Sequence, residues 1–400
     1  MDLLGTGAPA PAGFLTAAQA AIRQENLGGW LFYNVFHRDE LSDSILEVNP
    51  QATNTRPWAC IVLADKPAVK LVHAIEAGIL DHVPGKTVVY STRAEFLRAV
   101  EAAIPRGMTI AAQFSANFPV SSFLDHGAAR LFEDAGARLV SSEGLIARRL
   151  GTLDERGVRS HEKAASALYE IVRTSWQRLT QAIRAGNALY ERDVLEWMTA
   201  LIDESGLETD SVPLVASGKG SSNPHYAPRE RGSLLSHGDV VQLDIWARER
   251  GPDAVFADIS WIGVIAEEAS PKLARVFDAV VDARETAVKL ITERLSARRA
   301  VTGADVDRAV RARLAARGFS SGIRHRTGQS IGRRVHGYGV NLDSVEFPDE
   351  RPLLRGACFS IEPGIYLEEF GMRTEIDAYI TDGGLVVSGN ERQARLLLLE

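Results

Sequence analysis

The segment VVQLDIW, residues 240–246, places one acid, Asp244, inside an otherwise apolar run. Three later runs each carry one acid in the same way: VFADIS (255–260), FSIEPG (359–364) and GMRTEI (371–376). Apolar runs of this length predict short strands, in which alternate side chains share one face of a sheet. The acids in these three runs are Asp258, Glu362 and Glu375.

The period of two also predicts which neighbours share a strand face with each acid. The expected faces are Gln242 with Asp244 and Trp246, Phe256 with Asp258 and Ser260, and Arg373 with Glu375 and Asp377. We therefore expect the four acids to converge inside a sheet. Carboxylates are seldom buried unless they are paired or bind a metal, because the bare charge is costly to desolvate. The pattern predicts a bound cation, or a proton shared between acids.

The order of these motifs resembles the pita-bread (M24-type) metallopeptidases. This group includes the Xaa-Pro aminopeptidases, the prolidases, creatinase and the methionine aminopeptidases. The resemblance covers about residues 155 to 385, and besides the acids it rests on NPHY (223–226), HRTGQSIG (325–332), Val335-His336, and Tyr366 after Glu362.

The resemblance implies a fold class and a domain division. The class is α/β (α+β). A creatinase-like N-terminal α/β domain, residues 1–155, is expected to precede a pita-bread hydrolase domain, residues 156–400.

The resemblance further implies two divalent metal ions, of manganese, zinc, cobalt or iron. Asp258 and Glu375 match the bridging ligands, Asp244 the terminal acid, and Glu362 the remaining carboxylate. Metal-dependent members read His-x-x-Gly-His in the loop, and here Gln329 replaces the second histidine. An amide oxygen can coordinate a hard cation but is a weaker donor to transition metals than imidazole. Whether metal is bound is therefore left open.

Five residues match catalytic positions of the family. His225 and His336 match histidines that lie beside the metals and hold substrate or the developing tetrahedral oxygens. Glu362 would also take part in proton transfer, Arg373 would pair with the acids, and Tyr366 matches a proton relay. The alternatives are structural: satisfied histidines, a salt-bridged arginine and a packed tyrosine.

Two further residues have weaker arguments. His325, the first histidine of the loop, could replace Gln329 as a ligand, although it lies four residues away. Arg38, which follows His37 in a polar turn, could reach over the site, since N-terminal domains of the family shape substrate length; a solvated loop charge is the alternative. The glycines of residues 328–332 do not predict a phosphate loop, because no Lys-Ser/Thr follows them.

Length and composition limit the remaining possibilities. A chain of 400 residues suits two domains, and 45% hydrophobic with 24% charged residues is typical of a globular protein. A net charge of -7 without a basic block argues against nucleic-acid or membrane partners. The N-terminus does not read as a signal peptide, so we expect a cytoplasmic location. Cys60 and Cys358 are isolated in apolar runs and are expected to be buried thiols.

The periodicity predicts alternating helices and strands up to about residue 142, and further helices around the acid-bearing strands in the rest of the chain. In the first half, helices are expected at residues 15–24, 93–104 and 128–135, and strands at 30–33, 58–63, 69–73, 87–90, 109–112 and 138–140. A boundary is expected around residues 150–159. Beyond it, helices are expected at residues 161–185, 187–204, 271–295 and 304–317.

Three functions follow from these features. The first is a hydrolase of the Xaa-Pro aminopeptidase or prolidase type, which cleaves the bond before proline in short peptides by a metal-activated water. The second is a metal-free amidohydrolase similar to creatinase or the ectoine hydrolases, with His225 in catalysis. The third is a non-catalytic peptide-binding module. By analogy with the family, we expect a homodimer that acts on a small peptide or amide.

Overall fold

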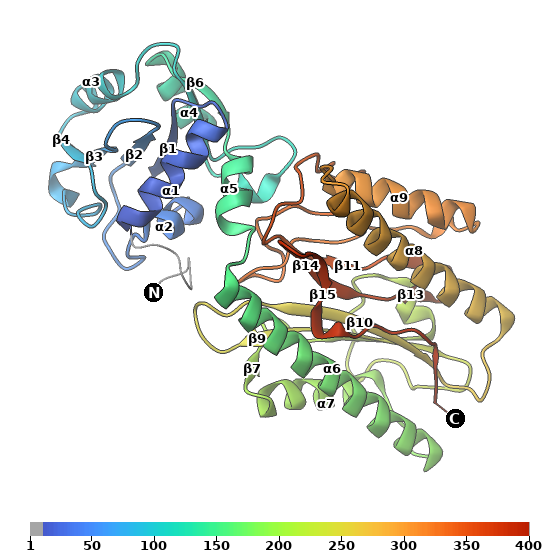
Figure 1. Cartoon of the computed structure of the whole chain (residues 1–400). Helices are drawn as coiled ribbons and strands as arrows, with labels where there is room; N and C mark the ends of the chain where they lie inside the picture. The colour runs from blue at the N-terminus through green and yellow to red at the C-terminus, as the bar shows by residue number, and fades with distance from the viewer. Residues whose placement is uncertain (1–10, 400) are drawn as a thin grey trace. The chain divides into compact units, whose positions relative to one another are not determined.

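The computed structural model describes residues 11–399. The chain divides into two compact units, residues 1–149 and 150–400. The mixed α/β class is confirmed, and each unit is built from its own sheets and helices (Figure 1). The assignment of the first unit to the creatinase type stays a prediction.

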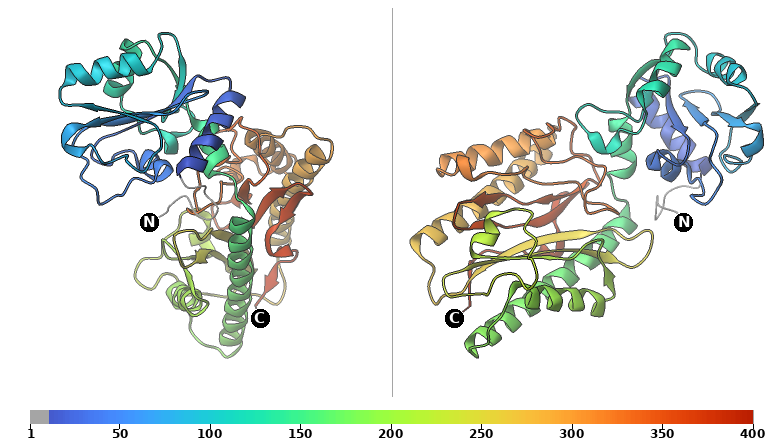
Figure 2. Two further views of the ribbon diagram at one scale, coloured as in Figure 1. Left: turned by 60° about the vertical axis from the view of Figure 1, so that its left-hand side comes forward. Right: turned by 180° about the vertical axis from the view of Figure 1, so that it is seen from behind.

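The first unit is a mixed sheet with helices on both faces (Figure 2). Its strand order is β4-β3-β2-β1-β5-β6, with β1 antiparallel to β2 and parallel to β5. Its strands are β1 (Gly29–Asn34), β2 (Trp58–Leu63), β3 (Val69–His73), β4 (Lys86–Tyr90), β5 (Thr109–Ala112) and β6 (Arg138–Ser141). Its helices are α1 (Pro11–Gln24), α2 (Glu40–Leu46), α3 (Arg93–Ala103), α4 (His126–Asp134) and α5 (Glu143–Leu150).

The predicted elements of the first unit are present, and two helices were missed. Phe96, Val100 and Phe132 of α3 and α4 pack in one core cluster with β1, β2 and β5. Helix α2, which spans only seven residues, was not predicted; the Asp39 side chain caps it by accepting from the Ser42 N–H at 2.9 Å, and Leu41, Ile45 and Leu46 are buried. Helix α5 was also not predicted.

The second unit carries the remaining elements. Its helices are α6 (Glu155–Arg184), α7 (Glu191–Glu204), α8 (Pro271–Ser296) and α9 (Gly303–Ala316). Its strands are β7 (Leu207–Glu208), β8 (Leu214–Ser217), β9 (Val240–Glu249), β10 (Ala257–Val264), β11 (Cys358–Ile361), β12 (Gly364–Tyr366), β13 (Gly371–Arg373), β14 (Ile376–Thr381), β15 (Gly384–Val387) and β16 (Leu397–Leu398).

The helix predicted from residue 161 begins six residues earlier, at Glu155. Asp154 caps it by accepting from the N–H groups of Arg156 and Gly157. A glycine therefore lies inside the first turn, where sequence suggested an interruption. The following helix begins at Glu191 rather than at residue 187, after Gly186 has turned the chain with a φ of 74°.

The β9–β10 hairpin separates an apolar face from an acidic one. Its register pairs Asp244 with Ser260 and Trp246 with Asp258, so both acids lie on the same face, as predicted. Leu243 and the other alternate residues of both strands pack in one cluster with α6 and α7 on the opposite face (Figure 1). Apolar residues of β11 and β14 pack in a second cluster with α8 and α9. The acids therefore lie between two sheets, each covered by helices.

Two acids predicted on strands lie just outside them. Glu362 follows the last residue of β11 and precedes Pro363, which has no N–H for a strand ladder. Glu375 lies in the break between β13 and β14, where its N–H donates to Ser260 O at 3.1 Å. The break lets β13 pair with β12 and β14 pair with β11. Arg373, Glu375 and Asp377 therefore do not lie on one continuous strand, although Arg373 and Glu375 both contact Ser260 Oγ and Asp377 accepts from the Asp258 N–H, so all three side chains face the β9–β10 hairpin.

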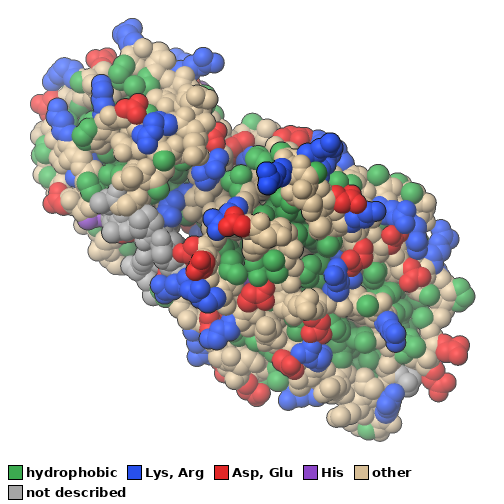
Figure 3. Space-filling model, in the orientation of Figure 1, with side chains coloured by type: hydrophobic (Ala, Val, Ile, Leu, Met, Phe, Trp, Pro, Cys, Tyr) green, Lys and Arg blue, Asp and Glu red, His purple; other side chains and the backbone are tan. Residues whose placement is uncertain are grey.

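The surface and the two cysteines match the composition. On the face drawn in Figure 3, Lys and Arg side chains are interspersed with Asp and Glu side chains. No helix within residues 11–399 is long and apolar enough to span a membrane. Cys60 and Cys358 are free and buried, as expected.

Candidate active site

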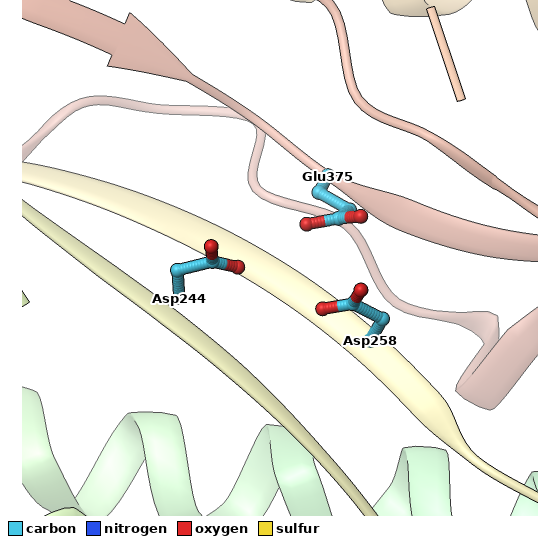
Figure 4. A group of neighbouring side chains, drawn as sticks. All are labelled: Asp244, Asp258 and Glu375. Carbon is cyan, nitrogen blue, oxygen red and sulfur yellow. The ribbon is translucent and has the colours of Figure 1, made fainter. Parts of the chain in front are cut away.

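Three acids from distant segments meet between the sheets (Figure 4). Asp244 and Asp258 come from the β9–β10 hairpin and Glu375 from the β13–β14 break, and their carboxylates point toward one another. One oxygen from each acid lies within 4.8 Å of the other two. Their exposed fractions are 7%, 5% and 2%. Three carboxylates this close and this buried repel one another unless a cation or protons lie between them.

Ser260 connects two of these acids to Arg373. Its Oγ lies 2.7 Å from Asp244 Oδ1 and 3.0 Å from Glu375 Oε2. The same oxygen accepts from Arg373 Nε at 3.2 Å. Ser260 lies on the strand face predicted to carry Asp258, so the period of two places it correctly.

Two carboxylate oxygens in the cluster have no hydrogen-bond partner among the described residues. They are Asp258 Oδ1 and Glu375 Oε1, and both are fully enclosed. Buried acceptors are almost always satisfied, so an unpartnered pair of anionic oxygens suits a site that binds a cation or holds protons. Oxygen-only ligand sets suit hard divalent ions such as magnesium and manganese. Asp244, Asp258 and Glu375 therefore fit a divalent cation.

Arg373 is the cation that the cluster already contains. Its guanidinium donates to Asp244 Oδ2, and its Nε lies 3.8 Å from Glu362 Oε2. Only 5% of the residue is exposed, so these charges interact with little screening. One guanidinium cannot neutralise four carboxylates, which leaves the cluster with excess negative charge.

Asp258, Glu362 and Glu375 hold protons more tightly than free carboxyls do. Burial, together with neighbouring acids, raises the pKa of Asp258 and Glu375 well above the usual range. Burial raises the pKa of Glu362 to about 7, although Arg373 and Arg326 oppose this shift. Near neutral pH, Glu362 can therefore both release and accept a proton, as a general acid or base requires.

We expect the metal-stripped protein to lose stability as pH rises from about 5 to about 8. A carboxyl whose pKa is raised by folding stabilises fully below its ordinary pKa, and this contribution is lost as pH rises through the raised value, about 7 for Glu362. Added Mn²⁺ should reverse the trend, because its ligands must be deprotonated. Thermal unfolding with chelator and with Mn²⁺ at each pH measures both slopes. A chelated protein that gains stability over this range contradicts the prediction, and Glu362→Gln should flatten the slope while the exposed Glu368→Gln should not.

Gln329 faces the cluster with its amide nitrogen. Nε2 donates to Asp258 Oδ2 at 3.0 Å, while Oε1 lies 3.5 Å from Arg326 Nη2. The guanidinium suits the amide oxygen and the carboxylate suits the amide nitrogen, which explains this orientation. Gln329 thus acts as a donor to Asp258. Its role as a metal ligand stays a prediction and requires the amide to turn over.

His325 does not supply the nitrogen ligand that Gln329 lacks. Its Nδ1 lies 2.6 Å from Arg326 O, which can only accept, so Nδ1 carries the proton. Its Nε2 therefore accepts from Tyr366 Oη at 2.8 Å, and Tyr366 Oη accepts from Arg373 Nη1 at 2.8 Å. Desolvation, with Arg373 nearby, lowers the pKa of His325 to about 3. Both ring nitrogens of the neutral histidine are engaged.

A pocket of about 1200 Å³ opens onto the cluster. His225 and His336 are exposed and line its wall, together with Gln329 and Arg373. The volume is above the roughly 300–1,000 Å³ of common small-ligand sites and leaves room for a short peptide. All predicted metal ligands and catalytic residues except Tyr366 line this pocket, and Tyr366 contacts it through Arg373. Their catalytic roles stay predictions.

Two buried acids that sequence reasoning missed position the loops of this wall. Glu191 accepts from Tyr226 Oη at 2.8 Å and from the Ser217 and Ser233 N–H groups, which fixes the segment that carries His225. Asp307 accepts from the Thr327 N–H at 3.0 Å and also from the Ser344 N–H. Each acid lies on a helix among apolar positions that face the core. An acid on such a buried face is the signal in the sequence that could have revealed its role.

Two arginines of the wall were also missed, and one predicted group stays unplaced. Arg324 and Arg326 line the pocket on either side of His325. The only signal in the sequence is their place in the predicted loop. Arg38 pairs with Asp125 at 2.6 Å on the surface of the first unit, so its proposed reach over the site stays a prediction.

Comparisons with known proteins agree with this geometry. A sequence model described as "Metallopeptidase family M24" matches residues 159–382. The chain is 26% identical over 232 residues to an Xaa-Pro dipeptidase of Pyrococcus horikoshii, which covers 58% of this chain and 60% of that protein. It is 28% identical over 172 residues to an Xaa-Pro dipeptidase of Lactobacillus helveticus, which covers 43% and 42%. The chain spans about half the length of the curated relatives that it matches.

Solved structures agree over nearly the whole chain. The dipeptidase PepE of Mycobacterium ulcerans has a TM-score of 0.73 at 23% identity, and the match covers 98% of this chain and 99% of that one. At this identity the likeness shows the fold.

Proposed function

The chain belongs to metallopeptidase family M24, and on that premise we propose that it cleaves the peptide bond before proline in short peptides. One observation carries the proposal: buried acids with two unpartnered oxygens lie at the base of an open pocket. The Xaa-Pro dipeptidases among the relatives support proline specificity. A pure binding module has no need for such a cluster, so it is the weaker explanation.

The residues divide the work of amide hydrolysis among them. Asp244, Asp258 and Glu375, with Glu362 beside them, would hold divalent metal. Bound metal would supply Lewis-acid polarisation and an activated water. Glu362 would carry the proton toward the leaving amine, because its pKa of about 7 suits transfer in both directions. His225 would hold the substrate or its developing oxyanion from the pocket wall.

A metal-free amidohydrolase is the second candidate, and Gln329 favours it. The family's histidine ligand is absent, and the amide that replaces it donates to Asp258. In this case His225 would act as the general base, and the acids would share protons. Their raised pKa values allow such sharing.

Metal content and peptide hydrolysis together test the proposal. Elemental mass spectrometry of protein purified without chelator should find divalent metal, and a supplemented sample should release proline from Xaa-Pro dipeptides. For Gln329→His, we expect about tenfold to a hundredfold tighter Mn²⁺ or Zn²⁺ binding by calorimetry, since imidazole is the stronger donor. A wild-type protein that binds no metal, paired with a variant that does, would favour the metal-free candidate. The expected homodimer and cytoplasmic location stay predictions.

A further inference from the structure

The pocket wall carries an arginine that forms no ion pair with any acid of residues 11–399. Arg326 is half-buried in the loop between His325 and Gln329 and lines the pocket. Its Nη2 lies 3.5 Å from Gln329 Oε1. Within residues 11–399, no carboxylate oxygen lies within 4.0 Å of its guanidinium. A half-buried guanidinium without an anionic partner is suited to accept one from a ligand.

Arg326 differs in this respect from the other buried arginine of the site. Arg373 donates to Asp244 and lies beside Glu362, so its charge serves the acid cluster. Arg324 also lines the pocket and forms no ion pair among the described residues, but it is exposed and its charge is screened by water.

The acids around the pocket oppose the approach of an anionic substrate, and a cation in the wall would offset this repulsion. Asp210 and Glu346 line the same pocket as the acid cluster. A substrate with a carboxylate would be repelled by this surface unless a positive group faced it. The planar fork of a guanidinium binds a carboxylate through two parallel hydrogen bonds, which an amide or a hydroxyl cannot match.

We propose that Arg326 binds a carboxylate of the substrate, so that the pocket selects peptides with an anionic group. The inference rests on the proposed peptide hydrolysis and names its substrate class. Two positions on a short peptide offer this chemistry: an acidic side chain on the residue before proline, and the C-terminal carboxylate. The peptides chosen for the test separate them.

The test compares kcat/KM for matched peptides in wild type and Arg326→Gln, both supplemented with Mn²⁺. Glu-Pro against Gln-Pro isolates a side-chain carboxylate, and Gln-Pro against its C-terminal amide isolates the terminal one. We expect wild type to prefer the acid by about tenfold to a hundredfold in one of these pairs. Arg326→Gln should lose that preference, and an unfolding temperature equal to that of wild type would show that its fold is intact. The pair that loses its preference identifies the carboxylate.

Two control variants separate direct contact from general electrostatics. Arg324→Gln removes the same charge from an exposed position and should change the preference by less than about threefold. Arg299→Gln, exposed and outside the pocket, should change nothing. Unchanged ratios in Arg326→Gln, or a larger effect of Arg324→Gln, overturn the assignment. Arg326→Glu should reverse the side-chain preference toward Lys-Pro if the side chain is the ligand.

Binding separates this inference from the proposed function. Calorimetry of the same peptides with chelated protein needs no turnover. If wild type cleaves no peptide, the proposed function fails, yet a preference for the acid that disappears in Arg326→Gln still supports the anion site. Equal affinity of wild type and Arg326→Gln for acid and amide peptides overturns the inference even if hydrolysis is found.

Discussion

Glu375→Gln is expected to abolish metal binding and to lower kcat/KM for Xaa-Pro dipeptides on the order of 1000-fold. Glu375 is one of three acids whose oxygens lie within 4.8 Å of one another, and its Oε1 has no partner among the described residues. An amide in its place keeps the shape but loses the charge that holds a cation. Mn²⁺ affinity by calorimetry and peptide hydrolysis should fall together.

The control for this variant is Glu368→Gln, a change of the same kind at an exposed residue outside the pocket. It should leave both quantities within about twofold of wild type. Because Glu375 repels Asp258, its neutralisation should also raise the unfolding temperature of the chelated protein. Retained metal affinity in Glu375→Gln would show that the cluster is not the metal site.

Arg373→Met should destabilise the protein by about 3–5 kcal/mol, as expected when one partner of a buried ion pair is removed. The change leaves Asp244 without its cation and removes the donors to Ser260 and Tyr366. Urea unfolding measures the loss. The loss should be largest with chelator, since bound Mn²⁺ would replace part of the missing positive charge.

Arg313→Met provides the exposed comparison. Arg313 forms a two-bond pair with Asp282 on the surface, at 2.7 and 3.0 Å. Surface pairs of this kind contribute little to stability, because water screens their charges. If Arg373→Met costs no more than Arg313→Met, the buried arginine does not offset the charge of the acid cluster.

Local periodicity predicted the elements that face one environment along their whole length. The β9–β10 hairpin alternates apolar and acidic residues, so the positions of Asp244 and Asp258 could be read directly. Helix α8 keeps one face against the core along its length, and its observed end lies only one residue beyond the predicted end. The pattern failed at Glu362 and Glu375, where the chain leaves one strand partner and joins another. Such breaks depend on which distant segment each strand pairs with, and the local period of apolar residues carries no information about that pairing.

The residue types at the site were available from the sequence, whereas their pairings were not. The order of the acids and the replacement of histidine by Gln329 follow from the sequence and its resemblance to a family. The orientation of the Gln329 amide depends on Arg326, which lies beside the amide oxygen and so leaves the amide nitrogen to contact Asp258. The occupied nitrogens of His325 likewise depend on Tyr366, a residue 41 positions away.

The sequence by itself determined which chemical groups this protein has and the strands that present two of its acids. Only the tertiary structure decided which charges are compensated: Arg373 pairs with Asp244, whereas Arg326 has no acid partner within residues 11–399. The physical reason is that strand and helix periods depend on near neighbours, whereas the energy of a buried charge depends on every group within a few ångströms. At this site those groups come from segments more than a hundred residues apart.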